Sequence, residues 1–174
     1  KKQIKTDAMS LAAQIGLVKS IKKYKLKKII TFHGNIAKSK NFSESFPLIY
    51  KWTKSKYKSK DILVADYVSG MMSTYSRKIK LDTLKNITKD EVGILSNSKC
   101  LGEGVDVPTL DGVSFFDPKR SEIDIIQSVG RAIRKPANVN KDFGYILVPV
   151  FIDKKENFTK IIDKTNFKSV LQII

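Results

Sequence analysis

Two arginines near the end of the chain have the spacing and setting of an anion-binding pair. The stretch SEIDIIQSVGRAIRKP, residues 121–136, places Arg131 and Arg134 three residues apart on a predicted helix. The chain has 29 lysines and only four arginines, so arginine is used here although lysine would already supply charge. A guanidinium adds a planar fork of donors that fits phosphate oxygens. We therefore expect this helix to bind a phosphate group.

The predicted arginine helix has two faces at about 100° per residue. Gln127 and Gly130 fall on the face of the two arginines, and Ser121 is the expected N-cap. The opposite face is expected to pack on a sheet and carries Ile125, Ile126, Val129 and Ile133. A solvated basic helix would fit the arginines alone. A mid-helix glycine costs roughly 1 kcal/mol, so Gly130 favours close approach of another surface.

Three further stretches follow predicted strands and carry residues suited to binding. In CLGEGVDVP, residues 100–108, the glycines permit a tight backbone, and Asp106 can accept a hydrogen bond from a sugar hydroxyl or an arginine. A Gly-x-Asp loop is also a common turn. In KIITFHGN, a lone His such as His33 is more often an ordinary polar residue than a catalytic one, and contact with a nucleic-acid backbone is a better interpretation than catalysis. In YVSGMMSTYS, the Ser69-Gly70 turn leads into a helix whose N-terminus can bind phosphate.

Short apolar runs alternate with helical segments, which is the pattern of an α/β fold. Five strands are predicted, at residues 28–33, 61–68, 92–96, 112–117 and 143–150. Helices are predicted at residues 10–24, 39–52, 73–85 and 121–135, the first with Leu11, Ile15, Val18 and Ile21 on one face. Continuous apolar strands joined by helices favour a parallel sheet covered on both faces. The ligands of such sheets gather at the carboxyl ends of the strands.

Composition indicates a globular chain with a polyanionic partner. Of 174 residues, 41% are hydrophobic, and the formal net charge is +16 with a pI near 9.8. This charge favours nucleic acid as the partner, although lysines spread along the whole chain also fit a solvated surface. The single cysteine excludes an internal disulfide and fits a reducing compartment, and one cysteine with one histidine disfavours a zinc site.

Targeting signals are not evident in the sequence. No apolar run approaches the ~20 residues of a membrane span, and the first residues lack the apolar core of a signal peptide. We therefore expect a cytoplasmic protein with no membrane partner. The chain begins with Lys1 rather than Met, which predicts that it is part of a larger polypeptide.

The chain offers anion-binding arginines without the other parts of a nucleotide site. The sequence contains no GxxxxGK[ST] loop to cradle a triphosphate. Its one four-residue stretch of the DExx type, Asp90-Glu91-Val92-Gly93, precedes a predicted strand and so is not placed to hold Mg²⁺ at a strand end. This asymmetry predicts half of a composite ATP site.

The ordered set TFH, YVSG, SNSKCLGEGVDVP and QSVGRAIR resembles motifs IV, IVa, V and VI of the second RecA-like domain of superfamily 2 helicases and translocases. The resemblance covers residues 27–150 and is closest to helicase modules of bacterial type ISP restriction enzymes. It implies an α/β RecA-like fold, a parallel sheet with helices on both faces. It also implies ATP and Mg²⁺ as cofactors, DNA as a partner, and a cleft completed by an N-terminal RecA-like domain of the same polypeptide.

The resemblance implies a role for each motif residue. Arg131 and Arg134 would be arginine fingers that reach the γ-phosphate, with Gln127 positioning the catalytic site. Residues near the nucleotide would be Glu103, Gly104, Asp106 and Gly130, and residues near the nucleic-acid backbone would be Thr31, His33, Gly70, Ser98 and Lys99. The Ser98-Lys99 pair replaces the Ala-Arg or Thr of many relatives, so the phosphate contacts of motif V differ from theirs.

We therefore predict the second motor domain of an ATP-dependent DNA helicase or translocase within a restriction or defence enzyme. The expected organisation is an N-terminal helix and linker at 1–26, the RecA-like domain at 27–152 and a helical extension at 153–174. Alone, the chain should hydrolyse little or no ATP. The alternative is a basic nucleic-acid-binding module that uses no ATP. A Rossmann-type enzyme is disfavoured because no GxGxxG follows the first strand.

Overall fold

The computed structural model describes residues 7–54, 60–98, 100, 109–118, 121–134, 143–151 and 165–173, without the side chains of Lys54 and of residues 131–133. In these ranges, five parallel strands form one sheet in the order β2-β3-β1-β4-β5. The strands are β1 Lys28–Phe32, β2 Ile62–Ser69, β3 Glu91–Ser98, β4 Gly112–Phe115 and β5 Tyr145–Leu147. Each corresponds to a predicted strand, and the parallel arrangement is confirmed.

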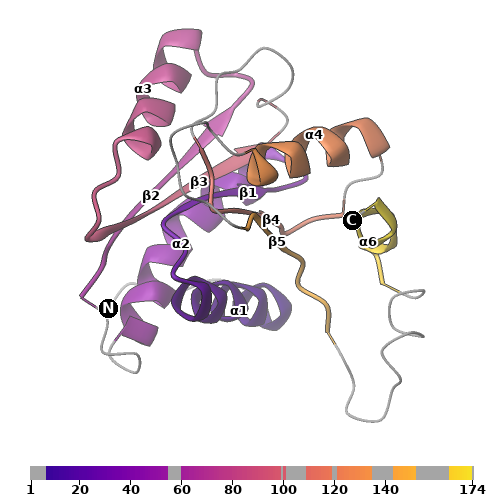
Figure 1. The fold of residues 1–174 in the computed structure, drawn as a ribbon, viewed down its shortest axis with the longest axis horizontal. Helices are drawn as coiled ribbons and strands as arrows, with labels where there is room; N and C mark the ends of the chain where they lie inside the picture. Colours follow the sequence, from indigo (N-terminus) through magenta and orange to yellow (C-terminus); the bar gives the residue numbers. More distant parts are fainter. Residues whose placement is uncertain are drawn as a thin grey trace.

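Helices connect the strands and cover both faces of the sheet (Figure 1). They are α1 Ala8–Tyr24, α2 Ile36–Lys54, α3 Thr74–Lys85, α4 Glu122–Ile133 and α6 Lys168–Ile173. The first four match the predicted helices, and α6 lies within the predicted C-terminal extension. No helix in the described part of the chain is long and apolar enough to cross a membrane.

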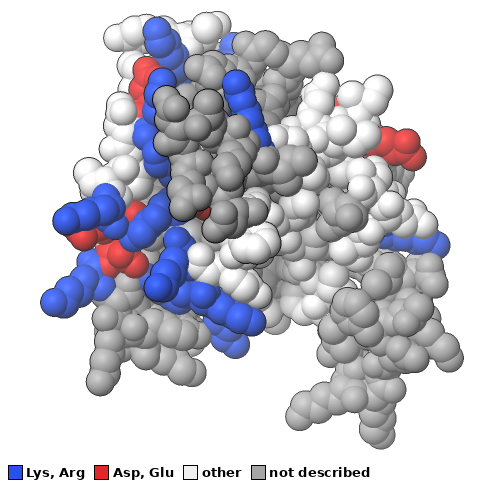
Figure 2. Space-filling view, viewed as in Figure 1, with Lys and Arg blue, Asp and Glu red and all other residues white. Residues whose placement is uncertain are grey.

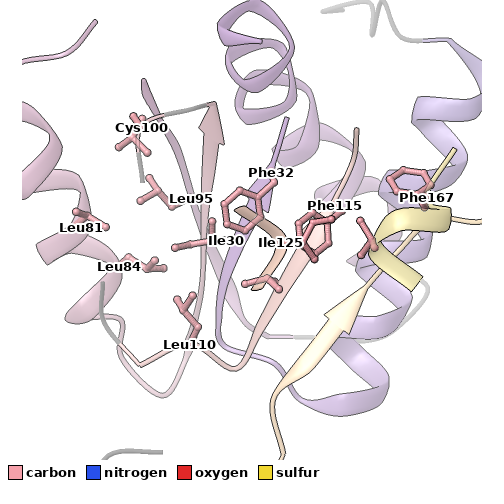
Figure 3. Close-up of a cluster of buried hydrophobic side chains, with 13 residues drawn as sticks. Ile30, Phe32, Leu81, Leu84, Leu95, Cys100, Leu110, Phe115, Ile125 and Phe167 are labelled. Carbon is pink, nitrogen blue, oxygen red and sulfur yellow. The ribbon is translucent and has the colours of Figure 1, made fainter. Parts of the chain in front are cut away.

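Alternate residues of the central strand enter two separate cores. Ile30 and Phe32 of β1 join Leu81 and Leu84 of α3, together with residues of α4 and α6, in one buried cluster (Figure 3). Ile29 of β1 points to the other face and joins the buried side chains of α1 and α2, which are Leu17, Val18, Ile21, Phe42, Phe46 and Tyr50. The near-continuous apolar sequence of β1 therefore follows from its burial on both faces.

The buried face of α1 differs from the predicted one. Gln14, Leu17, Val18 and Ile21 are buried, whereas Leu11 and Ile15 are only partly buried. The helix is turned because it packs against α2, where the Gln14 amide accepts a hydrogen bond from the Ser45 hydroxyl at 3.3 Å. A buried polar side chain with a partner takes the place that the apolar pattern gave to Leu11 and Ile15.

Helix α3 lies unusually close to the sheet at Gly93 of β3. A Cβ atom on Gly93 would come within 2.6 Å of Ile87 and 2.7 Å of Leu84, so only glycine fits there. Leu81 and Leu84 of α3 are buried beside it. This contact fixes the position of α3 and of the turn that precedes it.

Acidic side chains close the amino ends of the strands. The Asp111 carboxylate accepts hydrogen bonds from the backbone N–H groups of Lys27 and Lys28 at 2.7 and 2.9 Å. Asp61 accepts from the ammonium groups of Lys22 and Lys27, both at 2.9 Å. Burial opposes the charge on Lys22, but its hydrogen bonds to Tyr50 and Asp61 outweigh burial and raise its pKa.

Candidate functional site

Four strands, β2, β3, β1 and β4, end side by side and bring the predicted binding stretches to one edge of the sheet. In the strand register, Phe32 of β1 lies opposite both Asn97 of β3 and Phe115 of β4. Ser98 of β3 lies opposite Ser69 of β2. The residues that follow these positions include His33 and Gly70, so the expected gathering at the carboxyl edge is present in the fold.

The end of β1 is a buried polar group and not an exposed contact. Thr31 is fully buried, and its hydroxyl lies 2.9 Å from Nε2 of His33 and donates to Oγ of Ser96 at 3.3 Å. The His33 ring is 8% exposed and packs 4.9 Å from the Phe42 ring and 5.2 Å from the Phe116 ring, centroid to centroid. These contacts place Thr31 and His33 in the buried layer beneath the edge.

Burial lowers the pKa of His33 to about 4, with Asp117 opposing the shift and Lys38 adding to it. The imidazole is therefore neutral at physiological pH. A neutral ring with one nitrogen bonded to Thr31 is a poor partner for a phosphate anion. It is well suited to orient the strand end.

The turns after β1 and β4 are tied together by Asp117. Its carboxylate accepts a hydrogen bond from the backbone N–H of Gly34 at 2.9 Å and forms an ion pair with Lys38. A cavity of about 680 Å³ opens next to these residues. It is lined on one side by α1 and α2 and on the other by residues 116–118, 149, 151 and 165–167.

The segment after β3 begins with a fixed residue. Cys100 donates hydrogen bonds to the Asn97 amide oxygen from its backbone N–H, at 3.2 Å, and from its thiol, at 2.9 Å. Burial raises the pKa of this thiol to about 11, against the influence of the nearby Arg77, so the cysteine is not a nucleophile. Lys99, Glu103, Gly104 and Asp106, which were expected to bind nucleotide or nucleic acid, lie outside the described residues.

Helix α4 begins as predicted. The Ser121 hydroxyl caps it by accepting from the backbone N–H of Asp124 at 3.3 Å. Its inward face differs from the prediction, because Ile125 is fully buried whereas Ile126 is 57% exposed. Ser128 is buried in the place expected for Ile126, and its hydroxyl donates to the Asp124 carbonyl at 2.6 Å. This bond satisfies the hydroxyl within the helix, so a small polar residue fits against the sheet.

The outward face of α4 carries Ile123, Ile126 and Gly130, with Gln127 partly buried beside them. The helix ends at Ile133, and Arg134 is its exposed C-cap with extended backbone angles. The side chain of Arg131 lies outside the described residues, so the relative directions of the two guanidinium groups are still a prediction.

Two glycines, Gly70 at the end of β2 and Gly130 in α4, have open space around them. A Cβ atom on Gly70 or Gly130 would meet no atom within 4 Å. Neither glycine is therefore required by the packing of the described residues. A glycine that its own domain does not need is consistent with a ligand or a second surface approaching from outside.

The described residues contain no group of three or more His, Cys, Asp or Glu side chains that could hold a metal ion. A nucleotide with its Mg²⁺ would therefore need carboxylates from elsewhere. What the described residues offer to a triphosphate is the exposed Arg134 at the end of α4 and the open face of that helix at Gly130. These groups would contact a nucleotide from one side only.

Some residues at the edge were not singled out from the sequence. Asp117 ends a strand in the same way as the predicted residues, and that position was the signal that could have found it. Met71 and Tyr75 are 87% and 74% exposed next to Gly70. Exposure of a side chain depends on the packing of its helix, so no sequence signal marked these two.

Comparison with known proteins identifies the domain. The family model described as the helicase conserved C-terminal domain matches residues 13–136. Putative helicase 22 of Sulfolobus islandicus filamentous virus is 33% identical over 89 residues, which are 51% of this chain and 15% of that protein. Probable helicase A859L of African swine fever virus is 35% identical over 95 residues, 52% of this chain and 11% of that protein. The chain thus spans a small part of the relatives it matches.

Solved structures agree with this assignment. The ATP-dependent type ISP restriction-modification enzyme LlaBIII bound to DNA superposes on 96% of this chain and 11% of its own, with a TM-score of 0.75 and 31% identity. Domain 2 of the DEAD-box helicase Mss116p bound to an RNA duplex superposes on 81% of this chain and 49% of its own, with a TM-score of 0.52 and 20% identity, which supports the fold alone. The RecA-like fold predicted from the motifs is confirmed, and the chain belongs to the helicase conserved C-terminal domain family of superfamily 2.

Proposed function

We propose that this chain is the second motor domain of an ATP-dependent DNA helicase or translocase, within an enzyme of the restriction or defence type. The observation that carries the proposal is 31% identity across 96% of the chain to an ATP-dependent restriction enzyme bound to DNA. Helix α4 begins directly after the carboxyl end of β4, the edge where nucleotides bind in parallel α/β folds, and this also supports the proposal.

In this proposal the ATP site is composite. Arg131 and Arg134 reach the γ-phosphate from α4, with Gln127 holding the geometry and Gly130 allowing close approach. Glu103, Gly104 and Asp106 contact the nucleotide from the segment after β3. Bound Mg²⁺ would neutralise charge on the phosphates, and its ligands, like the phosphate loop, would come from an N-terminal RecA-like domain of the same polypeptide.

The arginines would supply transition-state stabilisation. A guanidinium placed against the γ-phosphate binds the negative charge that spreads over its oxygens as the bond to the leaving group weakens. Two arginines on successive turns can satisfy two oxygens with planar donor pairs, which lysine cannot do. The chain alone, lacking the phosphate loop in its sequence, is expected to have little or no ATPase activity.

The nucleic-acid track would follow the carboxyl ends of β2 and β3. Gly70 offers an open backbone there, the buried Ser98 ends the neighbouring strand, and Lys99 follows it in the sequence. In the proposal, Thr31 and His33 position the strand end and do not contact nucleic acid, because both are buried and hydrogen-bonded to each other. The net charge of +16 favours a polyanion along this edge, and the lone thiol fits a cytoplasmic setting.

The decisive experiment is the DNA-stimulated ATPase rate of the full polypeptide with Arg131→Lys and Arg134→Lys. Charge is kept in both variants, so a loss of turnover reports the lost guanidinium geometry. We expect a decrease of up to roughly 10³- to 10⁵-fold for a direct γ-phosphate contact. Unfolding midpoints should stay at the wild-type value for Arg134→Lys, because Arg134 is exposed.

Turnover near the wild-type rate in both variants would contradict the finger assignment. A simpler check uses the sequence of the larger polypeptide. A GxxxxGK[ST] loop and a strand-terminal acidic pair upstream of this domain are required for the motor. Their absence would instead favour the basic module that binds nucleic acid without ATP.

A further inference from the structure

The turn before α3 and the first part of that helix expose an apolar surface that the fold does not use. Met71, Tyr75 and Ile79 are 87%, 74% and 48% exposed, and we call these three residues the α3 platform. Tyr75 and Ile79 are four residues apart in α3 and share one face of the helix. The opposite face holds α3 to the sheet through Leu81 and Leu84. The platform therefore lies mostly outside the core of this domain, with Ile79 half-buried at its margin.

The α3 platform lies beside the proposed nucleic-acid track. Met71 follows Gly70 directly, in a turn closed by a hydrogen bond from the backbone N–H of Met72 to the Ser69 carbonyl at 3.1 Å. Ser69 is paired with Ser98 at the end of β3. Arg77, two residues after Tyr75, is close enough to Cys100 to act on the pKa of its thiol. The platform is thus at the carboxyl edge of β2 and β3.

Basic residues outnumber acidic ones on the helix that carries the α3 platform. Helix α3 contains Arg77, Lys78, Lys80 and Lys85 but only one acidic residue, Asp82. Lys80 is turned inward, paired with Asp66 and lying over the Tyr67 ring at 5.5 Å. Lys78 is exposed and lies three residues after Tyr75, on the same side of the helix. Figure 2 shows Lys and Arg side chains gathered on the side of the molecule where Figure 1 places α3, β2 and α2.

An aromatic ring with a cation beside it is the combination that binds single-stranded nucleic acid. Every base has a flat face that stacks on an aromatic side chain, while a neighbouring cation contacts the backbone. An apolar protein segment would also cover Met71 and Tyr75. The excess of positive charge along α3 favours a polyanion instead. The flexible thioether of Met71 adapts to the edge of a ring.

We propose that the α3 platform stacks against unpaired bases of the nucleic-acid strand that this domain binds, with Tyr75 as the stacking ring and Lys78 on the adjoining phosphate. The proposal rests on the proposed function, because it needs a strand on the track beside Gly70. The platform would contact the bases of the strand, whereas the track contacts its sugar-phosphate backbone. Such stacking tolerates any base sequence.

The test measures equilibrium binding of the full polypeptide to two oligomers of equal length, an oligothymidylate and an abasic oligomer with the same number of phosphates. Tyr75→Ala should weaken binding to oligothymidylate by roughly 5- to 100-fold, the range for loss of one stacking ring, and leave binding to the abasic oligomer unchanged. Tyr75→Phe and Tyr75→Trp should keep wild-type affinity. Lys78→Gln should weaken binding to both oligomers and reduce the salt dependence.

Trp52→Ala is the matched control, since Trp52 is a 68% exposed aromatic residue on α2, a helix on the other face of the sheet. It should not change binding to either oligomer. If Tyr75→Ala binds both oligomers as the wild type does, the platform proposal is wrong while the proposed function stands. An equal loss on both oligomers also overturns it, because stacking requires bases. If the full polypeptide binds neither oligomer, the platform proposal is wrong as well, whereas the proposed function fails only if DNA does not stimulate the ATPase rate of that polypeptide.

Discussion

The two edges of the sheet use charge in opposite ways. At the amino edge, the Asp111 carboxylate accepts the backbone N–H groups of Lys27 and Lys28. Asp61 accepts the ammonium groups of Lys22 and Lys27, and the Lys28 ammonium donates to the carbonyl of Lys85 at 2.5 Å. At the carboxyl edge, Gly70, Met71 and Tyr75 are exposed. Both edges belong to the same parallel sheet and are a few residues apart along each strand.

This difference separates structural charge from charge that is available to a ligand. A carboxylate that accepts two backbone N–H groups is part of the fold, and removing it costs stability. Removal of an exposed side chain such as Arg134 costs the fold little, so the stability of the domain does not explain an arginine at this position. The net charge of +16 is therefore larger than the charge available to a ligand, because Lys22 and Lys27 already form ion pairs with Asp61 at the amino edge.

Asp111→Ala should show the structural edge most strongly. It removes the acceptor of two backbone N–H groups at the start of β1. Hydrogen bonds to a charged group contribute about 1.5–3 kcal/mol each, so we expect the free energy of unfolding to fall by roughly 3 kcal/mol in urea titrations. ATPase turnover of the full polypeptide, per folded molecule, should not change.

Asp90→Ala is the control for that variant, because Asp90 is an exposed carboxylate at the same edge. We expect an effect within about 0.5 kcal/mol, as for an ordinary surface substitution. A loss as large as that of Asp111→Ala would mean that the net charge at the edge matters, and not the two hydrogen bonds.

Because His33 is buried under the carboxyl edge, we expect the free energy of unfolding of the domain to depend on pH. Burial lowers its pKa to about 4 in the folded protein, whereas an unfolded histidine titrates near 6.5. The unfolded chain therefore binds one more proton between these values. The free energy of unfolding should fall as the pH is lowered from about 6.5 to about 4, by roughly 3 kcal/mol in all.

His33 is the only histidine in the chain, so His33→Gln isolates this effect. The carboxylates titrate in both proteins, and the difference between the two pH profiles measured by denaturant unfolding belongs to the imidazole. Parallel profiles across that window would show that the ring is not held neutral by the fold.

Gly130→Ala and Gly16→Ala sharpen the comparison with the smallest change. Both glycines lie within exposed helix turns, and a Cβ atom at either would meet nothing within 4 Å. Each substitution should therefore stabilise the domain by about 0.4–1 kcal/mol. Only Gly130→Ala should lower the ATPase rate of the full polypeptide, because we propose that another surface approaches it.

Equal ATPase rates in the two glycine variants would remove the argument for close approach at α4. A loss of stability in Gly130→Ala would also contradict the geometry, since it would mean that the methyl group meets an obstacle within the domain. Thermal unfolding and steady-state turnover are sufficient measurements.

The order of elements could be predicted because it depends on local pattern. Apolar runs of strand length, joined by helices, leave few arrangements other than a parallel sheet, and strand positions were correct to within a few residues. The Ser121 cap followed from residue type alone, since a hydroxyl before the first turn satisfies a free backbone N–H. The motifs carried the family, which the comparisons then confirmed.

Which side of a helix faces the core could not be predicted from apolar residues alone. Gln14 is buried on α1 because Ser45 of α2 donates to its amide, and Ser128 is buried on α4 because its hydroxyl bonds within the helix. Ile126 is exposed in consequence. Such choices depend on partners distant in sequence or on how a polar group is satisfied, and hydrophobicity records neither.

The sequence by itself determined that this protein has a parallel α/β sheet and an arginine-bearing helix after its fourth strand, because both follow from local periodicity and residue type, and the resemblance of its motifs added the RecA-like family. Only the tertiary structure decided that Thr31 and His33 are buried under the edge and that Met71 and Tyr75 stand exposed beside it. The physical reason is that exposure is set by how α3 packs at Gly93 and how α1 and α2 cover the strand ends. Those contacts join residues far apart in the chain.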